Sequence, residues 1–246
     1  MTPILSDHSA FDAYMLLIEA DGRRILYSGD FRLHGRKSIL VERMMSRPPR
    51  DIDILILEGT NLGTDKPCQT ERALEDDYTA DVMERIGDGT RLPRIGAGFD
   101  NLAVAITSGL RKVYGQRKGD AWIGRMAAEG TAARNLRNDD VVMLRDSLVR
   151  DYDRAGIRPC RADAFVWSMW KGYLEKGSTA RDWCPAGGAR IDCLHTSGHA
   201  SPADLRAFAD AIGAATVIPV HGANWDSDHG IRGIHPLPDG VPLPLA

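Results

Sequence analysis

Long apolar runs are missing from this chain of 246 residues, and none approaches the roughly 20 apolar residues that a membrane span needs. The first residues also lack the basic region and the long apolar stretch of a secretory signal peptide. By elimination, we expect a cytoplasmic protein with no membrane partner. The 43% of hydrophobic residues is ordinary for a globular protein, and the length suits one large domain or two modest ones.

Cysteine and excess charge are also scarce. The four cysteines are scattered and form no C-x-x-C pair, so we expect free thiols and regard two disulfides as the less favoured alternative. The net charge of −3 gives no overall electrostatic attraction to nucleic acid. Any nucleic-acid site would therefore need a local basic patch.

A β-hairpin is predicted near the start of the chain, because Asp21-Gly22 lies between two apolar runs. This dipeptide is typical of a two-residue type I′ turn, in which both central residues have positive φ. The two ends of a hairpin meet, so His8 before it and Asp30 after it should lie at the same end of a sheet. Such a pair offers potential metal ligands, although a polar pair that only caps strand ends is the alternative. The predicted hairpin strands cover residues 14–19 and 24–28.

The rest of the chain alternates strand and helix patterns. Residues 53–58 form a continuous apolar run, which predicts a strand buried on both faces and places Glu58 at a sheet edge. Ser201, followed by Pro202 and Asp204, predicts the start of a helix. The other predicted helices cover residues 38–46, 70–86, 99–113, 121–137 and 147–155, and the other predicted strands cover residues 141–144, 165–168, 190–194 and 216–220.

Polar side chains gather at the predicted ends of strands. Four imidazoles and two carboxylates occupy this kind of position, more than strand capping alone requires. We therefore favour a metal or phosphate-ester site. The six residues are His8, Asp30, Glu58, His195, His199 and His221.

These stretches resemble, in order, the motifs of metallo-β-lactamase-fold hydrolases of the ribonuclease J-like, β-CASP subgroup. The segments DHSAF (residues 7–11) and YSGDFR (27–32) look like the third and fourth metal motifs. The segments LEGTN (57–61), HTSGHAS (195–201) and IPVHG (218–222) look like three motifs of the subgroup, and WSMWKGYL (167–174) looks like part of its cap.

The resemblance implies an α/β fold, namely part of a metallo-β-lactamase αββα sandwich with an inserted, shortened β-CASP-like cap. The core would comprise residues 1–65 and 185–246, and the cap residues 66–184. The H-x-H-x-D-H motif of the family does not occur in this sequence, in which seven residues precede His8. We therefore expect the N-terminal part of the sandwich and the metal ligands of that motif to be missing.

The resemblance also implies a hydrolase that holds two zinc ions and cleaves phosphodiester bonds of nucleic acid, with RNA favoured over DNA, as ribonuclease J-like exonucleases do. Zinc occupancy in a chain without the H-x-H-x-D-H motif is expected to be poor. The implied metal ligands are His8, Asp30 and His221. The implied catalytic residues are His199 as proton donor, Glu58 and Asp30. The residues implied to lie beside the substrate phosphate are Ser197, Gly198 and His195.

Other functions stay open at this point. A degenerate hydrolase could act as a non-catalytic module that binds nucleic acid or a protein partner, and a homo-oligomer is compatible with the sequence. A small-molecule hydrolase of the same fold is disfavoured by the motif around His199 and the cap-like insertion. His34 could contact phosphate or lie in a solvated loop. Three aromatic residues could stack on bases, although core or interdomain packing is favoured for them: Trp167, Trp170 and Tyr173.

Overall fold

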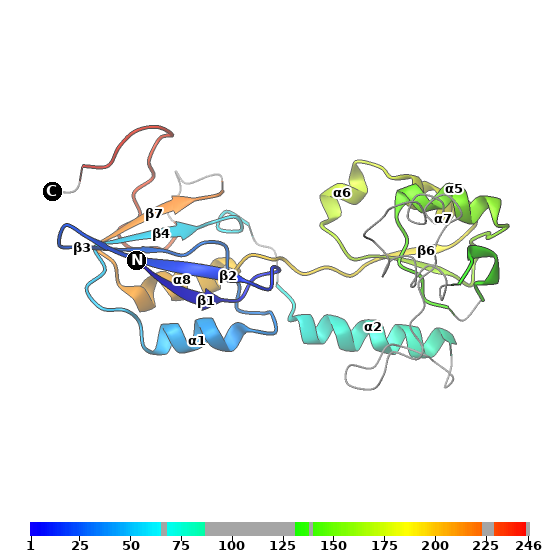
Figure 1. Ribbon diagram of the computed structural model, residues 1–246, viewed down its shortest axis with the longest axis horizontal. Helices are drawn as coiled ribbons and strands as arrows, with labels where there is room; N and C mark the ends of the chain where they lie inside the picture. The colour runs from blue at the N-terminus through cyan, green and yellow to red at the C-terminus, as the bar shows by residue number, and fades with distance from the viewer. Residues whose placement is uncertain (65–67, 87–130, 138–139, 223–228, 245–246) are drawn as a thin grey trace, which may run out of the picture. The chain divides into compact units, whose positions relative to one another are not determined.

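The computed structural model describes residues 1–64, 68–86, 131–137, 140–222 and 229–244 (Figure 1). The chain divides into two compact units. The first unit comprises Met1–Asp76 and Thr196–Ala246, and the second comprises Asp77–His195. The boundaries expected from the sequence fell after residues 65 and 184. The chain mixes helices with strands, so its class is α/β, as the sequence predicted.

A five-stranded sheet of order β1-β2-β3-β4-β7 forms the centre of the first unit (Figure 1). The first three strands pair antiparallel in succession, whereas β4 pairs parallel with both β3 and β7. Strands β1, β3, β4 and β7 therefore run in one direction, and their carboxyl ends meet at one edge, called the carboxyl edge below. The strands are β1 (Thr2–Ser6), β2 (Ala13–Ala20), β3 (Arg23–Tyr27), β4 (Ile54–Glu58) and β7 (Thr216–Val220).

The hairpin of β2 and β3 is the one that the sequence predicts. Asp21 and Gly22 have φ values of 50° and 74°, the two positive angles that a type I′ turn needs. Strand β1 was not predicted, because its five residues show no clear polar alternation. It pairs with β2, and Pro3 lies on it, consistent with an edge strand.

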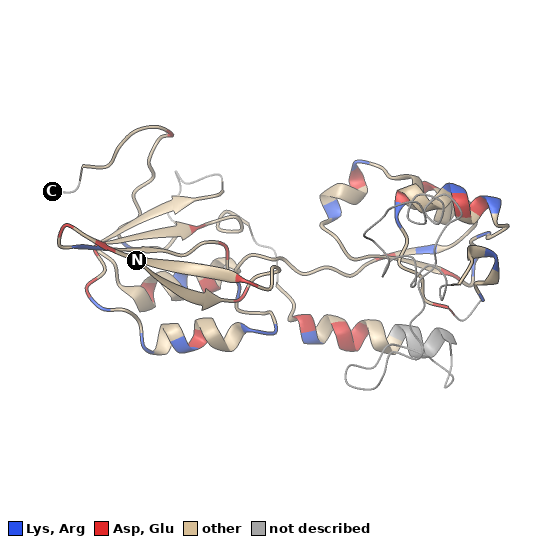
Figure 2. Ribbon diagram, viewed as in Figure 1, with Lys and Arg blue, Asp and Glu red and all other residues tan. Residues whose placement is uncertain are grey.

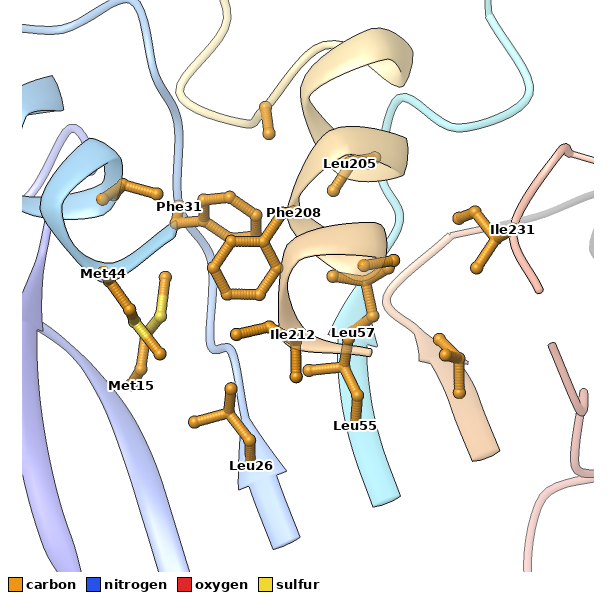
Figure 3. Close-up of a cluster of buried hydrophobic side chains, with 14 of the residues drawn as sticks. Met15, Leu26, Phe31, Met44, Leu55, Leu57, Leu205, Phe208, Ile212 and Ile231 are labelled. Atoms are coloured by element: carbon orange, nitrogen blue, oxygen red, sulfur yellow. The ribbon is translucent and has the colours of Figure 1, made fainter. Parts of the chain in front are cut away.

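One face of the sheet packs against helices α1 (Ser38–Ser46) and α8 (Pro202–Ile212) (Figure 1). The rings of Phe31 and Phe208 are fully buried in this core, with their centroids 4.6 Å apart (Figure 3). Helix α1 was predicted with its correct bounds. It buries Val41 together with Met44, while Ile39 is 48% exposed.

The opposite face of the sheet is also apolar. Leu5, Tyr14 and Tyr27 are 40%, 48% and 37% exposed. They alternate along their strands with residues of the core, because successive side chains of a strand point to opposite faces. Leu5 lies opposite Tyr14 in the register of β1 and β2. This face thus presents neighbouring apolar side chains to solvent.

Two helices begin with a side-chain cap, and the cap of α8 at Ser201 is the one that the sequence predicts. The Ser201 hydroxyl accepts the Asp204 N–H at 3.1 Å, and the Asp204 carboxylate accepts the Ser201 N–H at 3.3 Å. Helix α2 (Glu71–Ile86) follows Thr70, whose hydroxyl accepts the Ala73 N–H. Short-range side-chain chemistry therefore determines where these helices start.

The second unit contains a parallel pair of strands, β5 (Ala164–Trp167) and β6 (Arg190–Cys193), both close to their predicted positions. The strand predicted at residues 141–144 is wrong: Val141 and Met143 are exposed, and these residues pair with no strand in the described chain. Beyond the end of α2, the described part of the second unit contains the helices α5 (Asp146–Arg154), α6 (Lys171–Glu175) and α7 (Thr179–Ala186) and the 3₁₀ turn η1 (Ala133–Asn135).

Two further helices were predicted at residues 99–113 and 121–137, which lie wholly or partly outside the described residues. The described part of the helix predicted at 121–137 contains only the short turn η1. The rest of that helix, and the helix predicted at 99–113, lie outside the described residues.

All four cysteines are free thiols, as expected. Across the described part of the chain, no helix combines the length and the apolar character needed to cross a membrane.

Replacing Phe208 with alanine should lower the free energy of unfolding by about 3–5 kcal/mol, because it removes a fully buried ring and leaves a cavity beside Phe31. Phe11 is 86% exposed, so Phe11→Ala should change stability by less than about 0.5 kcal/mol. Urea unfolding followed by circular dichroism measures both. Equal effects of the two substitutions would contradict the assigned core.

Asp53 predicts an acid dependence of stability. Its carboxylate accepts the Arg24 N–H at 2.7 Å and contacts Arg23, and these partners hold the pKa of Asp53 below its usual value. The stabilisation is therefore present above the ordinary pKa and is lost as pH falls through the folded-state pKa. Asp53→Asn should lower the urea midpoint near pH 7, and by a smaller amount at about pH 3, which lies below the ordinary pKa of an aspartate. The neighbouring Asp51→Asn serves as control, and a loss of the same size at both pH values would disprove the assignment.

Candidate functional site

The carboxyl edge of the sheet brings most of the predicted site residues together. His8 follows β1, Asp30 follows β3, Glu58 ends β4 and His221 follows β7. The loop that leads into α8 adds His199. All five residues belong to the first unit. His8 and Asp30 therefore lie at the same edge of the sheet, as the predicted hairpin implied.

Three of these side chains form a group that could hold a metal ion. Asp30, His199 and His221 each offer one ligand atom, and these atoms lie within 4.8 Å of one another. Nδ1 of His221 is 2.9 Å from Oδ1 of Asp30. Two imidazoles and a carboxylate are a donor set that zinc accepts. Two residues predicted as ligands are therefore in this group, and the third member is the predicted proton donor.

The group is accessible to solvent on one side. The side chain of His221 is 59% exposed and that of Asp30 is 34% exposed, whereas that of His199 is 21% exposed. His221 has a φ of 57°, a left-handed conformation that is uncommon outside glycine. Local strain of this kind persists where the surrounding structure imposes it, and it is frequent at functional sites.

Glu58 lies next to His199 and is only 1% exposed. Its carboxylate accepts the backbone N–H of Thr60 at 2.9 Å and that of Ala200 at 3.2 Å. Nδ1 of His199 lies 3.6 Å from the same carboxylate. Glu58, as hydrogen-bond partner and as negative charge, raises the pKa of His199 above the ordinary value; Asp30 adds to this rise, and burial opposes it. His199 therefore holds a proton more readily than a free imidazole does.

Thr60 links two of the histidines, a role that the sequence analysis missed. Its hydroxyl donates to the carbonyl of His221 at 3.0 Å and lies 3.2 Å from Nδ1 of His199. Because the Thr60 hydroxyl donates its proton to the carbonyl of His221, its oxygen acts as the acceptor toward His199. Nδ1 of His199 must then carry a proton. The neutral ring of His199 consequently keeps Nε2 as its basic nitrogen.

His8 lies next to the group of three but is not a member of it. Its ring centroid is 5.3 Å from that of His199, and its Nδ1 is 2.6 Å from the carbonyl oxygen of Gly198. Because a carbonyl oxygen can only accept, Nδ1 carries the proton and Nε2 is the basic nitrogen, 3.2 Å from the Ser9 hydroxyl. This is the orientation that metal-binding histidines usually have.

The loop of residues 197–200 is held by Asn61, for which the sequence predicted no role, and by His34, for which a phosphate contact was left open. The Asn61 amide nitrogen lies 3.0–3.1 Å from the Ser197 hydroxyl and from the carbonyls of His199 and Ala200. Nε2 of His34 is 2.7 Å from the carbonyl of Ser197. His34 is 7% exposed, so its alternative placement in a solvated loop is wrong. The sequence signals for Asn61 are its place just after a strand end and its position as the last residue of the segment LEGTN.

Asp30 is positioned by the residues on both sides of it. Gly29 has a φ of 53°, and a Cβ atom there would lie 2.9 Å from the carbonyl oxygen of Tyr14. After Asp30, Phe31 enters the core, and the buried Arg32 lies 3.5 Å from Asp7 and 2.6 Å from Glu71. The loop that carries Asp30 is thereby fixed at both ends.

The three residues predicted to lie beside the substrate phosphate contact different parts of the protein. Ser197 uses its hydroxyl to accept the N–H of His199 at 3.0 Å, and Gly198 presents its carbonyl to His8. His195 belongs to the second unit, where its Nδ1 lies 3.3 Å from the carbonyl of Ser168. It is not part of the group on the carboxyl edge. A phosphate contact for these three residues stays a prediction.

Asn61→Ala should lower the free energy of unfolding by about 2–3 kcal/mol, because buried carbonyl oxygens lose their donor. Ser46→Ala, which removes an exposed hydroxyl at the end of α1, should cost less than about 0.5 kcal/mol. Urea unfolding gives both values. If Asn61→Ala proves as harmless as the control, Asn61 does not hold this loop.

No protein-family model and no curated protein matches this chain. Among solved structures, it is similar to one described as a protein of unknown function from Enterococcus faecalis V583, with a TM-score of 0.60 and 17% sequence identity. The match covers 89% of this chain and 57% of the other, so this chain spans little more than half the length of that protein. At this identity, the likeness concerns the fold alone.

Proposed function

We propose that this protein is a zinc-dependent metallo-hydrolase of the ribonuclease J-like, metallo-β-lactamase class, which hydrolyses phosphodiester bonds of nucleic acid, RNA more readily than DNA. The observation that carries the proposal is the group of Asp30, His199 and His221 at the carboxyl edge, with ligand atoms within 4.8 Å of one another. The carboxyl edge of a sheet with parallel strands is where α/β proteins usually place their sites.

The fold is compatible with this proposal. In an αββα sandwich, each sheet has helices on one face and a second sheet on the other. Here α1 and α8 cover one face, and the other presents Leu5, Tyr14 and Tyr27, which a second sheet would cover. The second unit would correspond to the β-CASP-like cap.

The donor groups fit a divalent metal. Asp30 and His221 would hold it, and His8 has its Nδ1 bound to a backbone carbonyl, so its basic Nε2 is available. When bound, such ions lower the pKa of water and neutralise charge on the phosphate.

The remaining residues would orient groups and move protons. Glu58 and Thr60 fix the ring of His199 through Nδ1. The raised pKa of His199 suits a side chain that donates a proton to the departing oxygen of the substrate. Asn61 and His34 hold the loop of residues 197–200 beside it. This arrangement divides the work between groups that bind, groups that orient and one proton donor.

Metal binding and hydrolysis can be tested on the same set of variants. With zinc added, the protein should bind the metal and should cleave labelled single-stranded RNA faster than DNA of the same sequence. His221→Ala should lower the metal content, and it should lower the cleavage rate by more than about 100-fold. Glu58→Gln should lower the cleavage rate by about 10- to 100-fold. Metal content is measured by mass spectrometry and cleavage by gel electrophoresis.

His235→Ala is the matched control, because His235 is exposed and its recorded hydrogen bond to Val217 uses the backbone N–H. It should behave like the unmodified protein. Zinc content near zero together with no cleavage would overturn the catalytic proposal. RNA binding without cleavage would favour the alternative of a non-catalytic binding module.

A further inference from the structure

Two aromatic rings are exposed at helix α6 of the second unit. Trp170, just before the helix, is 49% exposed, and Tyr173, within it, is 54% exposed. Their ring centroids are 5.3 Å apart, and the rings meet edge to face at 89°. Core or interdomain packing was favoured for these residues and for Trp167; core packing is confirmed for Trp167, which is 8% exposed, and is wrong for the other two. We call Trp170 and Tyr173 the aromatic pair.

Hydrogen bonds hold the backbone of Trp170, although its ring is exposed. The Trp170 carbonyl accepts the Trp167 indole N–H at 3.2 Å and the Tyr173 backbone N–H at 3.0 Å. The ring lies directly against Gly172, where a Cβ atom would come within 2.4–2.7 Å of three ring carbons. Only glycine at this position leaves room for the ring. The fixed backbone and the contacts of the ring with Gly172 and Tyr173 favour this position of the ring, which lowers the entropy cost of binding a ligand.

Positive charge lies next to the aromatic pair. Lys176 Nζ is 5.5 Å from the centroid of the Tyr173 ring, and Lys171 is exposed at the start of α6. Glu175 is the acidic residue of the same helix (Figure 2). The net charge of this segment is thus positive in a chain whose net charge is −3. A flat aromatic surface beside cations fits a ligand that combines planar rings with negative charge.

We propose that the aromatic pair is a stacking site for a base of single-stranded nucleic acid, with Trp170 as the stacking surface and Lys171 and Lys176 beside the backbone phosphates. The choice of nucleic acid as ligand rests on the proposed function. A protein partner fits less well, because two side chains supply far less than the roughly 800 Å² per partner of a stable protein interface. Every base has an aromatic face, so such a site tolerates any sequence.

Binding is tested with the full chain and a fluorescein-labelled oligouridine of about 12 nucleotides, with EDTA present so that no metal-dependent cleavage occurs. Fluorescence anisotropy gives the dissociation constant. Trp170→Ala should weaken binding by about 5- to 100-fold, as expected for the loss of one base stack, whereas Trp170→Phe should retain most of the affinity. Tyr14→Ala, which removes an exposed aromatic ring of the first unit, should leave the affinity unchanged.

A second substitution tests the position of the ring rather than its presence. Gly172→Ala keeps both aromatic side chains but displaces the indole, so it should also weaken binding. An abasic oligonucleotide of the same length should bind more weakly than oligouridine, and equally well to the unmodified protein and to Trp170→Ala.

Three results would overturn the stacking site: no binding of oligouridine, equal affinity of Trp170→Ala and Tyr14→Ala, or equal affinity for the oligouridine and the abasic strand. Because the measurement excludes metal, its outcome is independent of hydrolysis. Trp170-dependent binding without cleavage in zinc would support this site and overturn the catalytic proposal, and cleavage without Trp170-dependent binding would do the reverse.

Discussion

The buried carboxylate of Glu58 is the interaction on which the site depends. It accepts the backbone N–H groups of Thr60 and Ala200, and its own N–H donates to the Ser28 hydroxyl at 2.9 Å. One residue thus joins the ends of β3 and β4 to the loop before α8. A buried carboxylate is costly unless it is paired and hydrogen-bonded, and these donors meet that requirement. The same carboxylate sets the orientation and the pKa of His199.

His199 lies between two chemical roles, and Glu58 serves both. As a metal ligand, an imidazole must be neutral, whereas as a proton donor it must be charged. In either role, Nδ1 stays bound to Thr60 and near Glu58, which leaves Nε2 for the metal or for the transferred proton. His8 has the same arrangement, with the carbonyl of Gly198 in place of the acid. Fixed Nδ1 partners therefore recur among the histidines of this edge.

The two proposals rely on local chemistry because the chain as a whole offers little attraction for nucleic acid. Its net charge is −3, so binding would depend on particular groups rather than on a long-range field. The first unit provides carboxylate and imidazole groups, and the second provides the aromatic pair with two lysines beside it. One set suits phosphate chemistry at a metal, and the other suits a planar base.

The sequence by itself determined the elements that follow from neighbouring residues: the Asp21-Gly22 turn, the Ser201 cap and the apolar strand ending in Glu58. It also predicted that His8 and Asp30 share an edge, because a hairpin brings its ends together. Only the tertiary structure decided that Asn61 holds Ser197, 136 residues away, and that His199 joins Asp30 and His221. Trp170 and Trp167 look alike in sequence, yet one is exposed and the other buried. Turns and caps depend on local dihedral angles and hydrogen bonds, whereas these contacts depend on how distant segments pack.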